Sequence, residues 1–351
     1  MDKARSGNFF EDFRLGQRLE HPVPRTATAG DAALHLALTG SRFPVPCADT
    51  AARALGLKAA PLDDWLAFHL VFGRTVADIS LNALANLGYA EGRFGEPVYP
   101  GDTLRAVSEV IGLREASNRQ AGVVYVRTTG TNQAGAVVLE YVRWVLVNKR
   151  DHAAPAPEAV VPKLAPAVAP ADLIVPEGMT GRGYDTGLTG SPALWDDYRA
   201  GERIDHVDGA TVEEAEHQMA TRLYQNPAKV HFDRHRQAQS KLGRRLIYGG
   251  HVISIARALS FNGLANAVRV AAINGGRHVA PCTAGDTLYA WSEVLEKAPL
   301  AGRDDLGALR LRTVAAKDHP CSDFPLRDAE GKDHPAVLLD LDTWVLMPRR
   351  A

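Results

Sequence analysis

The chain is short of cysteine, of net charge and of long apolar runs. It has three cysteines, Cys47, Cys282 and Cys321, among 351 residues, with no close pairing pattern. This argues against a disulfide scaffold and is typical of the reducing cytoplasm. A formal net charge of −1 argues against a nucleic-acid partner, which would need a basic surface. No run approaches the roughly 18 apolar residues of a membrane span. Met1–Phe10 has no apolar signal core.

The composition is that of a globular protein of ordinary make-up. Hydrophobic residues account for 46% of the chain and charged residues for 23%, which separates it from disordered sequences. The length of 351 residues suits roughly two domains, at about 100–200 residues each.

The sequence repeats itself once. Residues 97–110, PVYPGDTLRAVSEV, match residues 281–294, PCTAGDTLYAWSEV, and Trp144-Val-Leu matches Trp344-Val-Leu at an offset of 200 (344 − 144). Matches in the same order along the chain predict a duplicated unit. We place the first unit at residues 1–150 and the second at 193–351. Residues 151–192 are rich in Ala and Pro, which favours an extended connector and a lead-in to the second unit.

Each unit is expected to contain one main helix and several long strands. In the second unit Val252, Ile255, Ala256 and Leu259 recur at helical spacing, and in the first unit the apolar residues of 65–79 do the same. β-branched or alternating runs predict strands at residues 104–111, 123–129, 137–147, 288–295, 309–314 and 337–347. The predicted class is α+β, with an antiparallel sheet around a helix. Two such sheets could pair edge to edge and bury their edges.

Two kinds of glycine-containing segment favour turns over ligand sites. The Gly-Asp pairs at Asp102 and Asp286 precede strands and are expected to set strand register. Gly275-Gly276 is also expected to form a turn, because no helix clearly follows it as a phosphate-binding loop would require.

Motif residues of the second unit resemble a known family. Asn226-Pro-Ala-Lys-Val-His231-Phe-Asp233 precedes the main helix, and Tyr248-Gly249-Gly250 opens it. Together with the Gly-Asp-Thr-Leu strand starts and the duplicated layout, these residues resemble the MaoC-like family of hotdog-fold enoyl-CoA hydratases. The resemblance covers nearly the whole chain. It implies tandem hotdog folds, a double hotdog, each half being an antiparallel sheet wrapped around a central helix.

The resemblance also implies catalytic roles for four residues. His231 would carry the proton traffic, since an imidazole titrates near working pH. The family has an Asp where this chain has Asn226, so Asn226 or Gln225 would position water. Gly250 sits where the oxyanion-stabilising glycine is expected, and backbone N–H groups at a helix N-terminus suit that task.

Within the family, the variant motif resembles the subgroup that interconverts mesaconyl-CoA and water with β-methylmalyl-CoA, as in the ethylmalonyl-CoA pathway. The second carboxylate of that substrate needs a cation, and Arg222, Lys229, Arg244 and Arg245 lie near the motif. Any of them could instead meet the CoA phosphates. The candidate substrate-binding residues are Gly249, Tyr248, His251, Asp233, Lys229, Arg222 and Arg245.

The first unit lacks the histidine. Its equivalent stretch, residues 39–49, keeps Thr39-Gly40 and Asp49 but places Cys47 near the position of His231, so this copy is expected to be catalytically silent. No zinc-type cluster or nucleotide-binding loop appears, so no metal or cofactor is expected beyond the CoA of the substrate. The expected partner is an acyl-CoA, without nucleic acid or membrane, and the protein is expected to form a homo-oligomer.

Three alternatives stay open. The first is another 2-enoyl-CoA hydratase. The second is an acyl-CoA thioesterase, since hotdog folds also serve these enzymes; they usually place a carboxylate on or beside the main helix, whereas residues 252–259 carry none. The third is a silent acyl-CoA-binding regulator.

Overall fold

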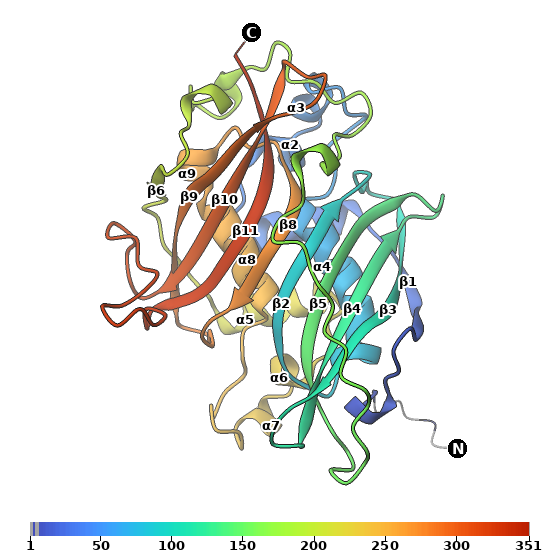
Figure 1. Ribbon diagram of the computed structural model, residues 1–351. Helices are drawn as coiled ribbons and strands as arrows, with labels where there is room; N and C mark the ends of the chain where they lie inside the picture. The colour runs from blue at the N-terminus through green and yellow to red at the C-terminus, as the bar shows by residue number, and fades with distance from the viewer. Residues whose placement is uncertain (1–2, 4–6, 351) are drawn as a thin grey trace.

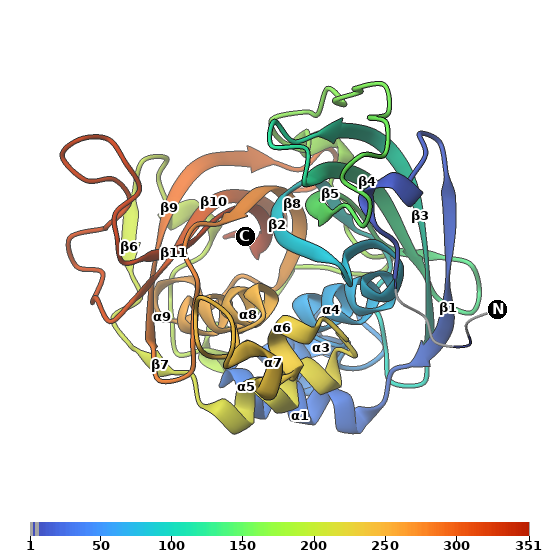
Figure 2. The same ribbon diagram turned by 90° about the horizontal axis from the view of Figure 1, so that it is seen from below.

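One long antiparallel sheet curves over two central helices that lie side by side (Figures 1 and 2). The helices are α4 (Asp64–Thr75) and α8 (Gly249–Leu259). The computed structural model describes residue 3 and residues 7–350; residues 1–2 and 4–6, within the segment that was expected to lack a signal core, and residue 351 lie outside this description. The α+β arrangement predicted from the sequence is confirmed.

The remaining elements follow the duplication. We call β1–β5 with α1–α4 the first half and β6–β11 with α5–α9 the second half. The strands are β1 (Arg18–Thr26), β2 (Ala83–Phe94), β3 (Thr103–Glu115), β4 (Ala121–Thr131), β5 (Val137–Asn148), β6 (Arg203–Asp205), β7 (Ala210–Thr211), β8 (Arg269–His278), β9 (Thr287–Pro299), β10 (Leu306–Lys317) and β11 (Val337–Pro348). The other helices are α1 (Ala29–Thr39), α2 (Pro44–Cys47), α3 (Asp49–Ala54), α5 (Glu214–Leu223), α6 (Lys229–Phe232), α7 (Arg234–Gln237) and α9 (Phe261–Leu264). A π-helical turn, η2 (Val76–Ser80), extends α4, and short 3-10 turns are η1 (Phe10–Asp12), η3 (Pro170–Asp172), η4 (Thr186–Leu188) and η5 (Trp195–Asp197).

The two halves join through the edges of their sheets. The strand order is β1-β3-β4-β5-β2-β8-β11-β10-β9-β6, with β7 also paired to β9. At the joint β2 pairs antiparallel with β8, Tyr89 opposite Gly276 and Ala90 opposite Gly275. The predicted edge-to-edge pairing is confirmed, although neither joining strand was among the predicted ones. The interpretation of Gly275-Gly276 as a turn is wrong, because both residues lie inside β8.

The two central helices begin in different ways. Asp63 caps α4 by accepting a hydrogen bond from the N–H of Trp65 at 2.9 Å, as N-cap carboxylates commonly do. Tyr248 occupies the N-cap of α8 and makes no side-chain cap there. The predicted apolar stripe of α8, including Val252 and Ile255, is buried in the shared core. Within residue 3 and residues 7–350, no helix has the length and apolarity needed to cross a membrane.

The Gly-Asp segments form turns in both halves. The Asp102 carboxylate accepts the N–H of Tyr99 at 2.7 Å, and the Asp286 carboxylate accepts the N–H of Thr283 at 2.8 Å. Both aspartates therefore stabilise the turn that leads into the following strand, β3 or β9, which confirms their predicted role.

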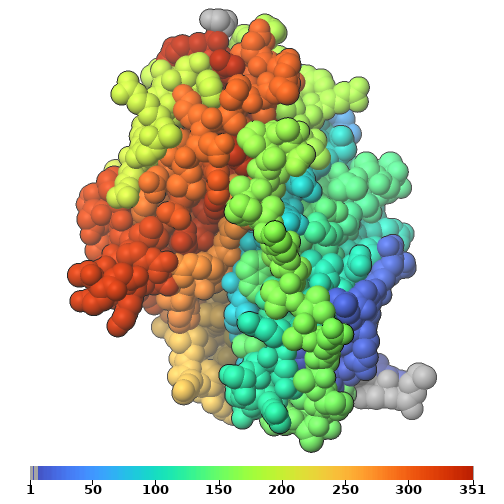
Figure 3. Space-filling model, viewed as in Figure 1, coloured from blue at the N-terminus to red at the C-terminus, as the bar shows by residue number. Residues whose placement is uncertain are grey.

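The segment between the halves runs over the outer face of the sheet, across the joint (Figure 3). Its Ala165 N–H donates to Glu91 of β2 at 2.9 Å, and its Val168 N–H donates to Asn274 of β8 at 2.9 Å. Trp344 of β11 donates its indole N–H to the Val168 carbonyl at 3.0 Å. The connector therefore ties strands of both halves together. The unit boundaries themselves stay predictions.

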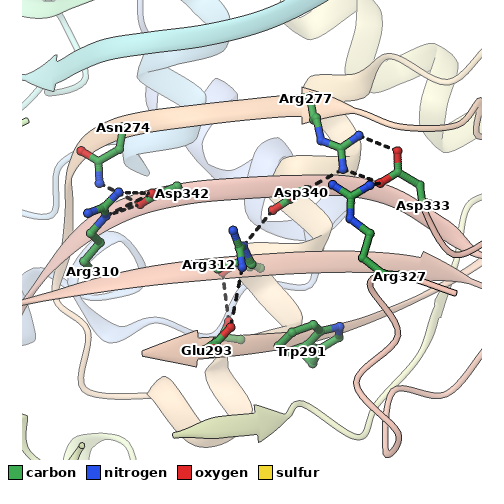
Figure 4. Close-up of polar contacts among 12 residues, drawn as sticks. Asn274, Arg277, Trp291, Glu293, Arg310, Arg312, Arg327, Asp333, Asp340 and Asp342 are labelled. Carbon is green, nitrogen blue, oxygen red and sulfur yellow. Dashed lines mark hydrogen bonds and ion pairs between the residues drawn. The ribbon is translucent and has the colours of Figure 1, made fainter. Parts of the chain in front are cut away.

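Arginine–carboxylate pairs cover the outer face of the second half (Figure 4). Arg310 of β10 bonds Asp342 of β11 at 2.7 Å, and Arg277 of β8 bonds Asp333 at 2.7 Å. Each of these arginines has an acidic partner on a neighbouring segment. This is the ordinary way to keep a charged side chain on a half-buried sheet surface.

Candidate active site

A cavity of about 550 Å³ lies at the junction of the two halves. The second half lines it with α6, the start of α8 and the end of β8. The first half lines it with the end of α4, η2, β2 and β5. None of the described lining residues is acidic, whereas Arg143, Lys229 and Arg236 are basic. The cavity therefore suits an anionic ligand.

His231, on α6, is buried in the wall of this cavity. Its Nδ1 lies 2.8 Å from the carbonyl oxygen of Leu246. A carbonyl can only accept, so Nδ1 carries the proton and Nε2 is left as a proton acceptor. Burial lowers the pKa of His231 to about 4, against a weaker opposite effect of that hydrogen bond. The imidazole is thus neutral and ready to accept a proton at neutral pH.

Asn226 lies in the same wall and is almost fully buried. Its Oδ1 accepts the backbone N–H of Ala228 at 3.1 Å. Because the backbone donor fixes the orientation of the amide, the Nδ2 group is the end that remains to donate. Asn226 can therefore bind a water molecule by donating a hydrogen bond from Nδ2 to the water oxygen. It cannot accept a proton from that water.

The start of α8 is the third part of the site. Gly249 lines the cavity and Gly250 follows it in the first turn. No acceptor among the described residues takes the N–H of either glycine, as expected for the first turn of a helix. A Cβ at Gly249 would collide with the His278 ring, and one at Gly250 would collide with the Tyr248 ring. Both positions need glycine because of this close packing.

Tyr248 connects the site to the helix core. Its ring centroid lies 5.6 Å from that of His231, and its hydroxyl lies 3.4 Å from Nδ1 of His69 on α4. His69 in turn lies 2.8 Å from Ser254 on α8 through Nε2. Burial raises the pKa of Tyr248 well above its usual value, so the phenol stays neutral. Tyr248 therefore packs between the two halves, against His231 of the second and His69 of the first.

His278 lines the cavity beside Gly249, and no part of the motif pointed to it. Its Nε2 lies 3.3 Å from the hydroxyl of Tyr89 on β2. Burial lowers the pKa of His278 to about 4, and the nearby His231 ring contributes to the same effect. The sequence offered no signal for it, because His278 follows Asn274-Gly-Gly-Arg277, a polar stretch that was interpreted as a turn.

Arg143, on β5, is a second lining residue that was not predicted from the sequence, and its side chain is fully buried. It donates to the hydroxyl of Thr75 at 2.8 Å and approaches that of Ser80 at 3.4 Å. Its guanidinium lies 4.2 Å from the centre of the Phe72 ring. The residue lies 83 positions before Asn226 in the sequence (226 − 143), so proximity to the motif could not reveal it.

Of the residues proposed from the sequence, His231, Asn226, Lys229, Tyr248 and Gly249 line the cavity. The other six do not: Gly250 follows Gly249 in the first turn of α8, and the structure gives most of the remaining five other contacts. The Gln225 side chain accepts from Arg74, and Asp233 caps α7 by accepting the Arg236 N–H at 2.9 Å.

Arg245 pairs with Glu214 and bonds Gln218, and Arg222 is exposed on α5. His251 is buried in α8 behind Tyr248, where burial lowers its pKa to about 3. Arg244, the other cation near the motif, is exposed and donates to the Ala284 carbonyl at 2.9 Å. Of the four cations proposed from the sequence, Arg222, Lys229, Arg244 and Arg245, only Lys229 therefore lines the cavity in the described part of the chain.

The first half has a counterpart of this cavity that is almost closed. It measures about 30 Å³ and is lined by α2, the start of α4 and residues at the start of β8. Counting within the matching helices, Pro46 stands where His231 does and Asp64 where Gly249 does, both at an offset of 185 (231 − 46 and 249 − 64). Within residue 3 and residues 7–350, no group of three or more His, Cys, Asp or Glu side chains could hold a metal ion.

Comparisons with known proteins agree on one family. The chain matches the family model described as mesaconyl-CoA hydratase over residues 1–324. A β-methylmalyl-CoA dehydratase from Chloroflexus aurantiacus is 61% identical over 348 residues, 99% of each chain. A mesaconyl-CoA hydratase from Cereibacter sphaeroides is 60% identical over 347 residues, 99% of this chain and 100% of the relative.

Solved structures agree on the fold. A MaoC domain dehydratase from Chloroflexus aurantiacus superposes with a TM-score of 0.98 at 60% identity over 100% of both chains. A Mycobacterium tuberculosis protein described as having a double hotdog fold superposes with a TM-score of 0.74 at 25% identity, over 97% of this chain and 98% of the other. The predicted tandem hotdog fold is confirmed.

Proposed function

The chain belongs to the mesaconyl-CoA hydratase family, and we propose that it catalyses the reversible addition of water to mesaconyl-CoA, which gives β-methylmalyl-CoA. It is a hydro-lyase of the MaoC-like, double-hotdog kind. One observation supports placing this reaction in the cavity: a neutral His231 lies in the same wall as the free N–H groups at the start of α8. The steps below are our proposal for how these groups act.

His231 is the general base. Water held by the Nδ2 group of Asn226 attacks the β-carbon, and its proton passes to Nε2 of His231. The Leu246 carbonyl fixes the ring and stabilises the charged form while it exists. The same proton then reaches the α-carbon, so the imidazole ends neutral. One O–H bond of water and the π bond between the α- and β-carbons break, and one C–O and one C–H bond form.

The start of α8 stabilises the negative charge of the intermediate. That charge develops on the thioester oxygen as the double bond is attacked. The N–H groups of Gly249 and Gly250 point out of the helix start with no protein acceptor among the described residues. Donors that are already in place cost no reorganisation when the charge forms. Gly249 lines the cavity directly, and Gly250 lies one residue further into the helix.

His278 supports the same end of the substrate. We assign the Tyr89 hydroxyl as the donor to Nε2 of His278, 3.3 Å away, which leaves the imidazole proton on Nδ1. The ring lies against Gly249, next to the proposed oxyanion position. We assign it the role of an additional donor there.

Lys229 and Arg236 line the cavity and are exposed, which suits them to the CoA phosphates at the entrance. We propose no resident cofactor, because protein groups supply the base, the water site and the oxyanion donors. The homo-oligomer stays a prediction. None of the three cysteines forms a disulfide, which supports the proposed cytoplasmic place of the enzyme in the ethylmalonyl-CoA pathway.

The thioesterase alternative is disfavoured by the same cavity. Hydrolysis on this fold usually relies on a carboxylate at the main helix, and no described residue lining the cavity has one. A silent binding protein would not need a neutral, oriented imidazole beside free oxyanion donors.

The proposed function is tested by mixing the purified protein with mesaconyl-CoA. Loss of the conjugated thioester absorbance, with β-methylmalyl-CoA as the product, is expected. The reverse reaction should restore the absorbance from β-methylmalyl-CoA. No absorbance change with mesaconyl-CoA or with crotonyl-CoA would refute the hydratase assignment, and release of free CoA thiol would favour the thioesterase.

A further inference from the structure

The end of the cavity near Phe72 holds a buried cation without an anion. Arg143 is fully buried, yet no carboxylate of the described residues forms an ion pair with it. Its partners are the hydroxyls of Thr75 and Ser80 and the Phe72 ring, and its buried Nε has no partner in the described structure. Burying a guanidinium without a counter-ion is costly, so such a site favours an anionic ligand.

Other arginines of this chain show the usual solution. On the outer face Arg310 bonds Asp342 at 2.7 Å (Figure 4), and in the closed counterpart cavity Arg269 lies 3.7 Å from Asp64. Arg143 lines the open cavity instead, where none of the described lining residues is acidic. A carboxylate supplied by the substrate would complete the same kind of pair.

The sheet places Arg143 next to the reacting groups. Arg143 lies opposite Tyr89 in the pairing of β5 with β2, and Tyr89 lies opposite Gly276 of β8. Residues directly opposite one another project to the same face of a sheet. Tyr89 contacts His278, and Phe72 lies between Arg143 and Tyr248, with ring centroids 5.6 Å apart for Phe72 and Tyr248. One row of side chains therefore runs from the guanidinium to the site.

The duplication shows that the arginine is not part of the shared scaffold. At the offset of 200 that relates Trp144 to Trp344, the counterpart of Arg143 is Thr343. The fold thus accepts an uncharged residue at this position. The charge at residue 143 calls for an explanation particular to the open cavity.

We propose that Arg143 binds the distal carboxylate of mesaconyl-CoA and thereby determines which enoyl-CoA is hydrated. This inference rests on the proposed function. In mesaconyl-CoA the distal carboxylate is attached to the β-carbon that water attacks. Pairing this carboxylate with a guanidinium holds the β-carbon in place. It also offsets the negative charge that would repel the oxygen of the attacking water. The first half would then supply specificity to a reaction catalysed by the second.

The test compares two substrates that differ at one group. 2-Methylcrotonyl-CoA has the carbon skeleton of mesaconyl-CoA with a methyl group in place of the distal carboxylate. We expect the wild-type protein to favour mesaconyl-CoA in kcat/KM. In Arg143→Gln this preference should fall by about 10- to 100-fold, the range expected for loss of a charge-assisted hydrogen bond. Arg143→Lys keeps the positive charge but loses the bidentate guanidinium. Its preference for mesaconyl-CoA should lie between those of the wild type and Arg143→Gln.

The controls separate a binding role from a structural one. Arg310→Gln removes an arginine from the outer face and should leave the preference unchanged. Equal losses of kcat/KM on both substrates in folded Arg143 variants would overturn the proposal, because a structural defect would lower the activity on both substrates alike. Equal kcat/KM of the wild type on both substrates would also overturn it, even if every Arg143 variant unfolds. Failure of the wild type to hydrate mesaconyl-CoA would refute the proposed function instead.

Discussion

The open cavity and its closed counterpart are built from matching elements and differ in a few side chains. In the open cavity a histidine on α6 faces a helix start made of two glycines. In the counterpart, α2 has Pro46 in place of the histidine, and Asp63 caps the helix by taking the N–H of Trp65. Asp64 takes the Val270 N–H at 2.8 Å, and the cavity shrinks from about 550 to about 30 Å³.

This difference shows how a duplicated fold can separate its tasks. The Asp63 carboxylate takes the N–H of Trp65, whose counterpart in α8, the N–H of Gly250, has no acceptor among the described residues. The first half therefore gains a helix cap and loses that donor for a substrate. The first half still contributes to the working cavity, through Arg143, Tyr89 and the end of α4. Each half is therefore needed for a different part of one site.

The largest effect should come from His231→Ala. Removing the base should lower kcat on mesaconyl-CoA by about 10²- to 10⁴-fold, the usual contribution of general acid–base catalysis. Steady-state kinetics by thioester absorbance measures the loss. The matched change in the first half, Pro46→Ala, should alter kcat by less than about twofold, since Pro46 lines the closed cavity and not the open one. Comparable losses in the two variants would contradict the assignment of one working site.

Gly249→Ala should have the next largest effect. A methyl group there collides with the His278 ring and moves the first N–H groups of α8. Loss of one oxyanion donor corresponds to about 10²- to 10³-fold in kcat. The KM for mesaconyl-CoA should change much less than kcat, because the donors act mainly on the transition state. Wild-type kcat in a folded Gly249→Ala protein would show that these donors are not used.

Acid should destabilise the second half through its buried histidines. Burial lowers the pKa of His231 and His278 to about 4 and that of His217 and His251 to about 3. In the unfolded chain each titrates near 6.5, so the unfolded state binds more protons between those values. The free energy of unfolding should therefore fall as the pH is lowered from about 6.5 towards 4, by up to about 3 kcal/mol for each of these histidines.

Urea titrations across this pH range measure the slope. The slope should be shallower in His231→Gln, which removes one of the titrating groups. An equal slope in the variant and the wild type would show that His231 titrates alike in the folded and unfolded states.

A smaller loss is expected for His278→Gln. If this ring donates to the thioester oxygen alongside two backbone groups, its removal should cost about tenfold in kcat, a typical value for one of several hydrogen bonds. Tyr89→Phe should produce a smaller loss in the same direction, since the phenol only sets which nitrogen of His278 carries the proton. Loss of activity in Tyr89→Phe that exceeds that in His278→Gln would reverse this order of roles.

The sequence predicted the scaffold better than the site. Repeated motifs and helical spacing were enough to find the duplication, α4, α8 and six strands, because these depend on local pattern. The joining strands β2 and β8 carry glycines at positions such as Gly92 and Gly275 that weaken the strand pattern. The motif located His231 and the start of α8. Arg143, Tyr89 and His278 enter the cavity only through strand pairing across the joint, which no local pattern contains.

The smallest expected change concerns the first half alone. Asp63→Ala removes the cap of α4 and should lower the free energy of unfolding by about 1 kcal/mol, the usual value of an N-cap. The kcat on mesaconyl-CoA should stay at the wild-type value, because Asp63 lines only the closed cavity in the described structure. Thermal unfolding and steady-state kinetics on one preparation check both points. The freed donors should not create a second site, since the counterpart position of His231 is Pro46. A change in kcat without a change in stability would mean that the two cavities are coupled rather than separate.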